Sequence, residues 1–97
     1  MSLIVSDVVV SLNGRDSGNT FFVVGVDGDY ALIADGRVRR LERPKRKKQK
    51  HLKFVRHGEG RVADKLRSGE HVSNGDIRRA LQSAINAPEV EGGMHSG

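Results

Sequence analysis

The chain of 97 residues has no cysteine and no tryptophan, and it has only one tyrosine, three phenylalanines and two prolines. Without cysteine, neither a disulfide framework nor a cysteine-based zinc site is possible, and the chain fits a reducing, cytoplasmic environment. No window approaches the roughly 20 apolar residues of a membrane-spanning helix. The first residues have no basic start and no long apolar run, so we do not expect a secretion signal.

Motifs for catalysis and metal binding are also lacking. The histidines show no metal-ligand spacing, and the closest pair, His51 and His57, lies among cations that would repel a metal ion. Asp27, Asp29 and Asp35 suggest a carboxylate site, but turn formation explains them without catalysis. Neither Ser17-Gly18 nor Ser68-Gly69 has the context of a nucleophile elbow, and no phosphate-binding P-loop is present. The sequence therefore predicts no enzyme, no cofactor and no small-molecule substrate.

Positive charge is concentrated in one part of the chain. Eleven of the 17 Lys and Arg residues lie in 37–57, where Glu42 is the only acid, while 1–36 carries net negative charge. A solvated face that serves solubility alone would normally mix both signs, so a polyanionic partner is favoured. A nuclear import signal within 44–50 is an alternative. The candidate RNA contacts in this segment are Arg37, Arg39, Arg40, Arg43, Lys45, Arg46, Lys47, Lys48, Lys50 and Lys53.

Short β-branched and apolar runs with tight turns between them fill the first half of the chain, which favours a small barrel that hides its own edges. Asp35-Gly36 suits a two-residue hairpin turn, so we expect the segment after it to pair back along the strand before it. Pro44 should end that fourth strand and leave Arg43–Lys50 as a connection. The five expected strands are Val8–Leu12, Thr20–Val26, Tyr30–Ala34, Arg37–Leu41 and His51–Val55.

Aromatic residues are too few to form an obvious base-stacking surface. Phe21 and Phe22 could stack on bases, but in so small a barrel at least one should be in the core. Two roles remain open for Tyr30: packing in a hairpin and stacking on a base. In the last expected strand, Leu52 and Phe54 fall on one face and Lys53 on the other.

Helical periodicity begins after residue 58. One helix is expected over Gly60–Arg67, and a second begins after the N-cap Ser73, with Asp76 three positions on as in a capping box. Ile77, Leu81, Ala84 and Ile85 then form an apolar stripe. The stripe must dock on Val62 and Leu66, on the barrel or on a partner. Pro88 should stop the helix, and we expect 88–97 to be disordered.

The loop between the first two expected strands is rich in glycine. Gly14 and Gly18 would let backbone N–H groups approach a phosphate, and the Arg15 and Asn19 side chains could donate to it. The plain alternative is that both glycines merely permit positive φ in a turn.

The stretch "VVVSLNGRDSGNTFFVVGVDGDYALIADG" resembles the KOW motif, a strand, a glycine-containing loop and a strand. The resemblance is closest to the large-subunit ribosomal protein fourteen family of archaea and eukaryotes and to small bacterial proteins similar to it. Gly18 falls at the motif's glycine, and the basic "RPKRKKQKHL" that follows strengthens the match. The resemblance covers about Val8–Phe54, and it implies an SH3-like barrel that contacts RNA through this loop and a neighbouring basic surface.

Together these observations predict a mainly β protein with a helical C-terminal part: a five-stranded SH3-like barrel over 1–57, a helical extension over 58–87 and a disordered tail over 88–97. The expected function is RNA binding, with ribosomal RNA and ribosomal proteins as partners. The main alternative is a KOW-type module that docks on an acidic protein surface of the transcription or translation machinery. Non-specific DNA binding is a third reading.

Overall fold

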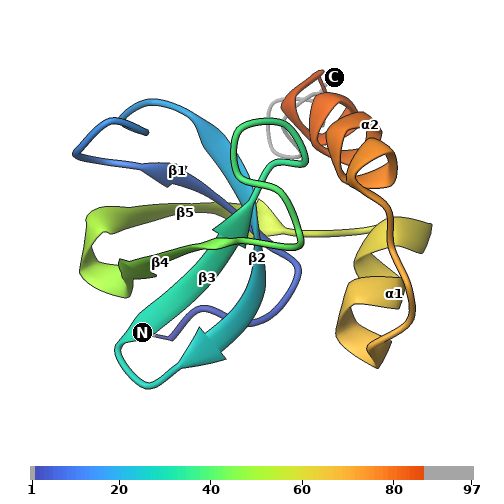
Figure 1. Cartoon of the computed structure of the whole chain (residues 1–97), viewed down its shortest axis with the longest axis horizontal. Coiled ribbons are helices and arrows are strands. Elements are labelled where there is room, and N and C mark those ends of the chain that lie inside the picture. Colours follow the sequence, from blue (N-terminus) through green and yellow to red (C-terminus); the bar gives the residue numbers. More distant parts are fainter. Residues whose placement is uncertain (1, 87–97) are drawn as a thin grey trace, which may run out of the picture.

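A computed structural model describes residues 2–86 of the chain, and it shows a five-stranded antiparallel sheet followed by two helices (Figure 1). The strands pair in the order β4-β3-β2-β1-β5, and β4 and β5 form the two edges of this sheet, which is not closed. A 3₁₀ turn, Gln49–His51, connects the two edge strands. The elements are β1 Asp7–Ser11, β2 Thr20–Asp27, β3 Tyr30–Ala34, β4 Lys45–Lys48, β5 Leu52–His57, α1 Arg61–Ser68 and α2 Asn74–Asn86. The expected mainly β layout with C-terminal helices is therefore confirmed.

The sheet is buried on both faces because its side chains alternate between two apolar clusters. Phe21 lies on one face with Val9, Val23 and Ile33. Phe22, the next residue, lies on the other face, in the cluster that the helices cover. The exposed fractions of the two rings are 0% and 2%, so neither is available for stacking on a base.

The predicted hairpin at Asp35-Gly36 is wrong, because 37–44 forms a loop and the fourth strand is Lys45–Lys48. The carboxylate of Asp35 accepts hydrogen bonds from the backbone N–H groups of Arg37 and Arg39, each at 2.9 Å. This side-chain bonding closes a wider loop in place of a two-residue turn. The segment 43–50, expected to be a connection, therefore contains both β4 and the 3₁₀ turn.

The edge strand β4 consists only of lysine and arginine. It pairs with β3 in the register Tyr30 with Lys48 and Leu32 with Arg46. Lys47 is its one buried residue, at 9% exposed, and Lys45, on the same face of the strand, is half-buried. An edge strand that carries this much charge resists pairing with another chain.

Both helices follow the sequence prediction closely. Ser73 Oγ accepts from the backbone N–H of Asp76 at 3.0 Å, and the Asp76 carboxylate accepts from the N–H of Ser73 at 3.2 Å, so the capping box is confirmed. Ile77 and Leu81 are buried against Val8 and Phe22 of the sheet. Ile85 was wrongly placed in the buried stripe, since it is 55% exposed. Ala84, one position earlier, packs against the cluster, so Ile85 lies off the packed face of the helix.

The expected disorder of 88–97 concerns residues outside the described range. Within residues 2–86, neither helix is long and apolar enough to cross a membrane.

Candidate nucleic-acid interface

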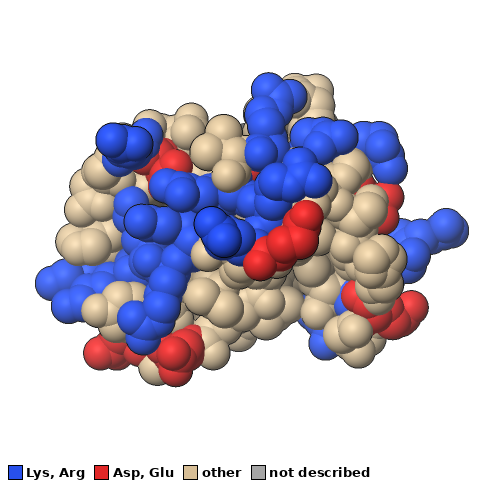
Figure 2. All heavy atoms as spheres, viewed as in Figure 1, with Lys and Arg blue, Asp and Glu red and all other residues tan. Residues whose placement is uncertain are grey.

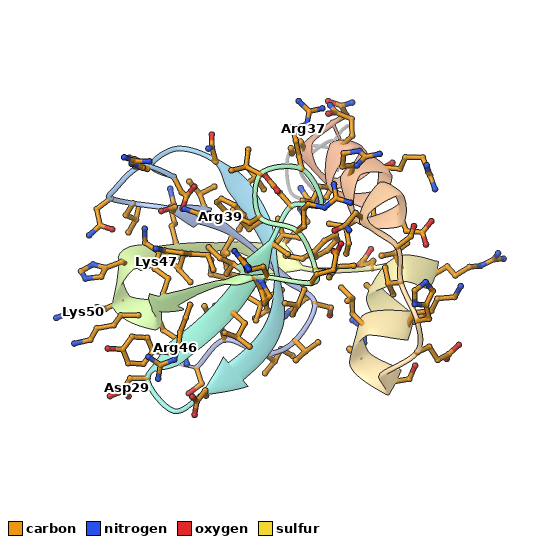
Figure 3. All side chains as sticks on the ribbon, viewed as in Figure 1. Asp29, Arg37, Arg39, Arg46, Lys47 and Lys50 are labelled. Atoms are coloured by element: carbon orange, nitrogen blue, oxygen red, sulfur yellow. The ribbon has the colours of Figure 1, made fainter. Side chains whose placement is uncertain are left out.

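Lysine and arginine side chains gather on the face of the molecule that carries β4 and the loop between β3 and β4 (Figure 2). We call this surface the basic face. Figure 3 shows it extending from Lys50 beside β4 to Arg37 beside α2. Its exposed or half-buried members are Arg37, Arg40, Arg43, Lys45, Arg46, Lys48 and Lys50.

Most of these cations have no hydrogen-bond or ion-pair partner among residues 2–86. In residues 2–86, no hydrogen bond or ion pair involves the side chain of six of the candidate contacts, and five of the six are exposed. Charges without internal partners keep their full attraction for a polyanion. The six are Arg37, Arg43, Lys45, Lys48 and Lys50 on the basic face, and Lys53 on β5.

Two further cations of the basic segment are used by the fold. The Lys47 ammonium donates to the backbone carbonyl oxygen of Asn13 at 2.7 Å. The guanidinium of Arg39 donates to the Asp16 carboxylate at 2.9 and 3.2 Å, and Asp16 is buried. Both contacts join the basic segment to the β1–β2 loop. Lys47 and Arg39 therefore hold the two sequence-predicted site segments together and are poorly placed to bind a ligand.

Two exposed arginines form only weak ion pairs. Arg40 lies 3.6 Å from Glu42, and Arg46 lies 3.4 Å from Asp27. Exposed pairs of this kind contribute about 0–1 kcal/mol, and salt screens them, so a phosphate can compete for either arginine.

The β1–β2 loop, residues 12–19, uses several of its backbone N–H groups internally. Those of Ser17, Gly18 and Asn19 donate to carbonyl oxygens of Gly14, Ser11 and Asp16 at 2.8–3.2 Å. Contact with a phosphate at Gly18 or Asn19 through these amides would have to break those bonds. The exposed side chains of Arg15 and Asn19 stay free of that conflict. Gly14 and Gly18 both have positive φ, which fits the plain turn reading.

The β3–β4 loop is held by α2. Arg78 donates to the carbonyl oxygen of Gly36 at 2.9 Å, and Asn74 Oδ1 accepts from the N–H of Leu41 at 2.8 Å. Gly36 has a φ of +77°, and a Cβ there would lie 2.3 Å from the Asn74 carbonyl oxygen. The helix thus fixes the path of the loop that presents Arg37, Arg40 and Arg43.

Glu42 is the one acid within this loop's basic stretch. The Asn74 side-chain N–H donates to its carboxylate at 2.6 Å, and this bond, together with the nearby Arg40, lowers the pKa of Glu42 below its ordinary value. Glu42 therefore stays ionised at neutral pH and leaves Arg40 partly neutralised. The cations on the β4 side of the basic face have no comparable neighbour in their own strand.

Asp16, Asn13 and Asn74 were missed by sequence reasoning. Each supports the interface through a contact with a residue more than 20 positions away, and no local pattern marks them. The capping box pointed to the start of α2, but not to the loop that α2 holds.

In comparisons with known proteins, no family model matches the chain and no curated protein matches it.

Proposed function

We propose that this chain is an RNA-binding module of the KOW type that associates with ribosomal RNA in the cytoplasm. The observation that carries the proposal is the set of cations on one face whose side chains have no hydrogen-bond or ion-pair partner in residues 2–86. Five such side chains come from the β3–β4 loop, β4 and the 3₁₀ turn. Neutralising RNA phosphates releases counterions, and this electrostatic effect supplies much of the affinity of nucleic-acid binding.

The strand arrangement supports an SH3-like barrel as the finer fold. The two edge strands β4 and β5 are consecutive in the chain and are separated by a single 3₁₀ turn. Leu12, just after β1, donates to the His51 carbonyl oxygen at 2.9 Å, and Lys47 reaches the β1–β2 loop. Shifts in register between Val23 and Gly25, and between Val8 and Val9, add local curvature to the sheet. The cluster around Phe21 would then be the barrel interior.

In the proposed mechanism, the basic face captures the RNA backbone and Arg15 adds a contact from the β1–β2 loop. Arg39 and Lys47 act as positioning residues, because they hold the loop against the basic segment. Gly14 and Gly18, expected from the sequence to contact RNA, have a structural role in this mechanism. Both residues provide the positive φ that the loop requires.

Binding to a folded fragment of ribosomal RNA, with duplex DNA as competitor, tests the proposal. We expect RNA to bind and an equal mass of duplex DNA to displace it poorly. Equal displacement by duplex DNA would instead identify a non-specific polyanion binder. Crosslinking followed by sequencing of the bound RNA would then locate the site.

The alternative function is docking on an acidic protein surface, and one feature favours it. A cleft of about 330 Å³ between β5, α1 and α2 is lined by apolar side chains such as Val62 and Ala84, and also by Arg56, Arg61 and one acid, Glu59. Partners that remain bound after complete nuclease digestion, and that are lost on Arg61→Glu, would favour this function over RNA binding.

A further inference from the structure

Tyr30 and Arg46 form a stacked pair at the end of the basic face. Tyr30 begins β3, and Arg46 lies in β4, diagonally across from it in the strand register. The guanidinium carbon of Arg46 lies 3.7 Å from the centroid of the Tyr30 ring. The Asp27 carboxylate lies 3.4 Å from one of its nitrogens. Figure 3 shows Arg46 beside the β2–β3 turn that carries Asp29.

The Arg46 side chain stays accessible to solvent although it stacks on the ring. One face of the group is against the tyrosine ring, yet the Arg46 side chain is 53% exposed. A guanidinium plane is a surface on which nucleobases stack. Because Tyr30 already fixes that plane, little conformational freedom would remain to be lost when a base binds.

Two lysines surround this pair. Lys48 pairs with Tyr30 in the register, and its ammonium lies 5.9 Å from the ring centroid. Lys50 follows in the 3₁₀ turn, and both lysines are exposed and have no partner in residues 2–86. Cations of this kind suit the phosphates on either side of a base that is turned out of its helix.

Building on the proposed RNA-binding function, we propose that the Tyr30–Arg46 pair stacks an unpaired base of the bound RNA. A base inside a continuous duplex stacks on its neighbours and does not offer its face to a protein. The target is therefore an RNA with an extruded base, in a loop or bulge, next to the phosphates held by Lys48 and Lys50. The same face would hold a fully paired duplex by charge alone.

The test compares two RNA hairpins that differ only by one bulged 2-aminopurine, whose fluorescence reports stacking. We expect the wild-type protein to bind the bulged hairpin about tenfold more tightly, which is the order of one base–side-chain stack. Arg46→Lys keeps the positive charge but removes the planar guanidinium. It should therefore abolish both the preference for the bulged hairpin and the change in 2-aminopurine fluorescence. Arg61→Lys, an exposed control on α1 outside the basic face, should keep both.

A second pair of variants separates stacking from the fold of the β3–β4 edge. Tyr30→Phe should behave as wild type, and Tyr30→Leu should lose the preference while its melting temperature shows whether it is folded. If the wild type binds both hairpins equally, or if Arg46→Lys and Arg61→Lys are indistinguishable, the stacking proposal is wrong and RNA binding by charge stands. If neither hairpin binds at all, the RNA-binding function itself fails.

Discussion

One small sheet carries both the basic face and a helix-covered face, which is the side packed against α1 and α2. The helix-covered face is buried, whereas the basic face is largely exposed to solvent. The helix-covered face buries Val8 and Phe22 under Ile77 and Leu81. The basic face presents cations, most of which have no partner in residues 2–86. The first arrangement stabilises the fold, and the second is the surface at which we propose that RNA binds. The two meet at one point, where Arg78 and Asn74 of α2 hold the β3–β4 loop.

The largest expected effect is on the helix-covered face. Leu81→Ala should lower the free energy of unfolding by about 2–5 kcal/mol, because it opens a cavity beside Phe22 and Ile77. RNA affinity, measured well below the melting temperature, should hardly change. Ile85→Ala is the matched control, and it should leave thermal stability close to wild type since that side chain is exposed.

Truncation after Val55 gives the sharper contrast for the same face. It removes both helices and uncovers Val8 and Phe22, so we expect no cooperative unfolding transition. A truncated chain that melts like the full-length protein would contradict this assignment and would make the helices a surface for another protein.

The contact between the two faces can be broken at Gly36. Gly36→Ala introduces a Cβ that would meet the Asn74 carbonyl oxygen, in addition to the roughly 1–2 kcal/mol of a left-handed conformation. We expect lower stability together with weaker RNA binding, because the loop that carries Arg37 and Arg40 must shift. Gly28→Ala is the control: φ there is +59° and nothing lies within 4 Å of the added atom. If both variants bind RNA equally, α2 does not position the basic loop.

Much of this architecture could be predicted from the sequence, and the failures have a physical cause. β1, β2, β3 and β5 are marked by β-branched residues and alternation, and α2 by its capping box. β4 has no apolar residue at all, so no periodicity marks it, and it forms because it pairs with the edge of β3. The position of the charge was predictable, but which cations are free was not, since partners such as Asp16 are distant in sequence.

A smaller effect is expected at the β1–β2 loop. Arg15→Ala should weaken RNA binding by about 1 kcal/mol, the order of one charge-assisted contact, and should leave the fold intact because the side chain is exposed. Isothermal titration against the same RNA measures the change. Arg61→Ala on α1 is the control, and equal affinities for the two variants would return the loop to a purely structural role.

The smallest effect concerns pH and the start of α2. Hydrogen bonds from Ser73, together with Arg79, lower the pKa of Asp76 below its ordinary value of 3.8. A carboxylate with a lowered pKa in the folded state stabilises that state above pH 3.8, and this contribution is lost as the pH falls through the folded-state pKa. The melting temperature of the wild type should therefore fall more between pH 5 and pH 3 than that of Asp76→Asn. If the melting temperatures of the two proteins fall equally over this pH range, ionisation of Asp76 does not contribute to stability.

The central claim, that the β4 side of the basic face captures RNA by charge, is tested most directly by salt. With about five phosphates neutralised, log K against log salt should have a slope of roughly −3.5 to −4.5. Lys45→Gln, Lys48→Gln and Lys50→Gln together should make that slope shallower by about 2 to 3 units. A matched triple away from this face, Arg61→Gln, Lys65→Gln and Arg79→Gln, should leave it unchanged. If the two triple variants have equal salt slopes, the β4 side of the basic face does not capture RNA by charge.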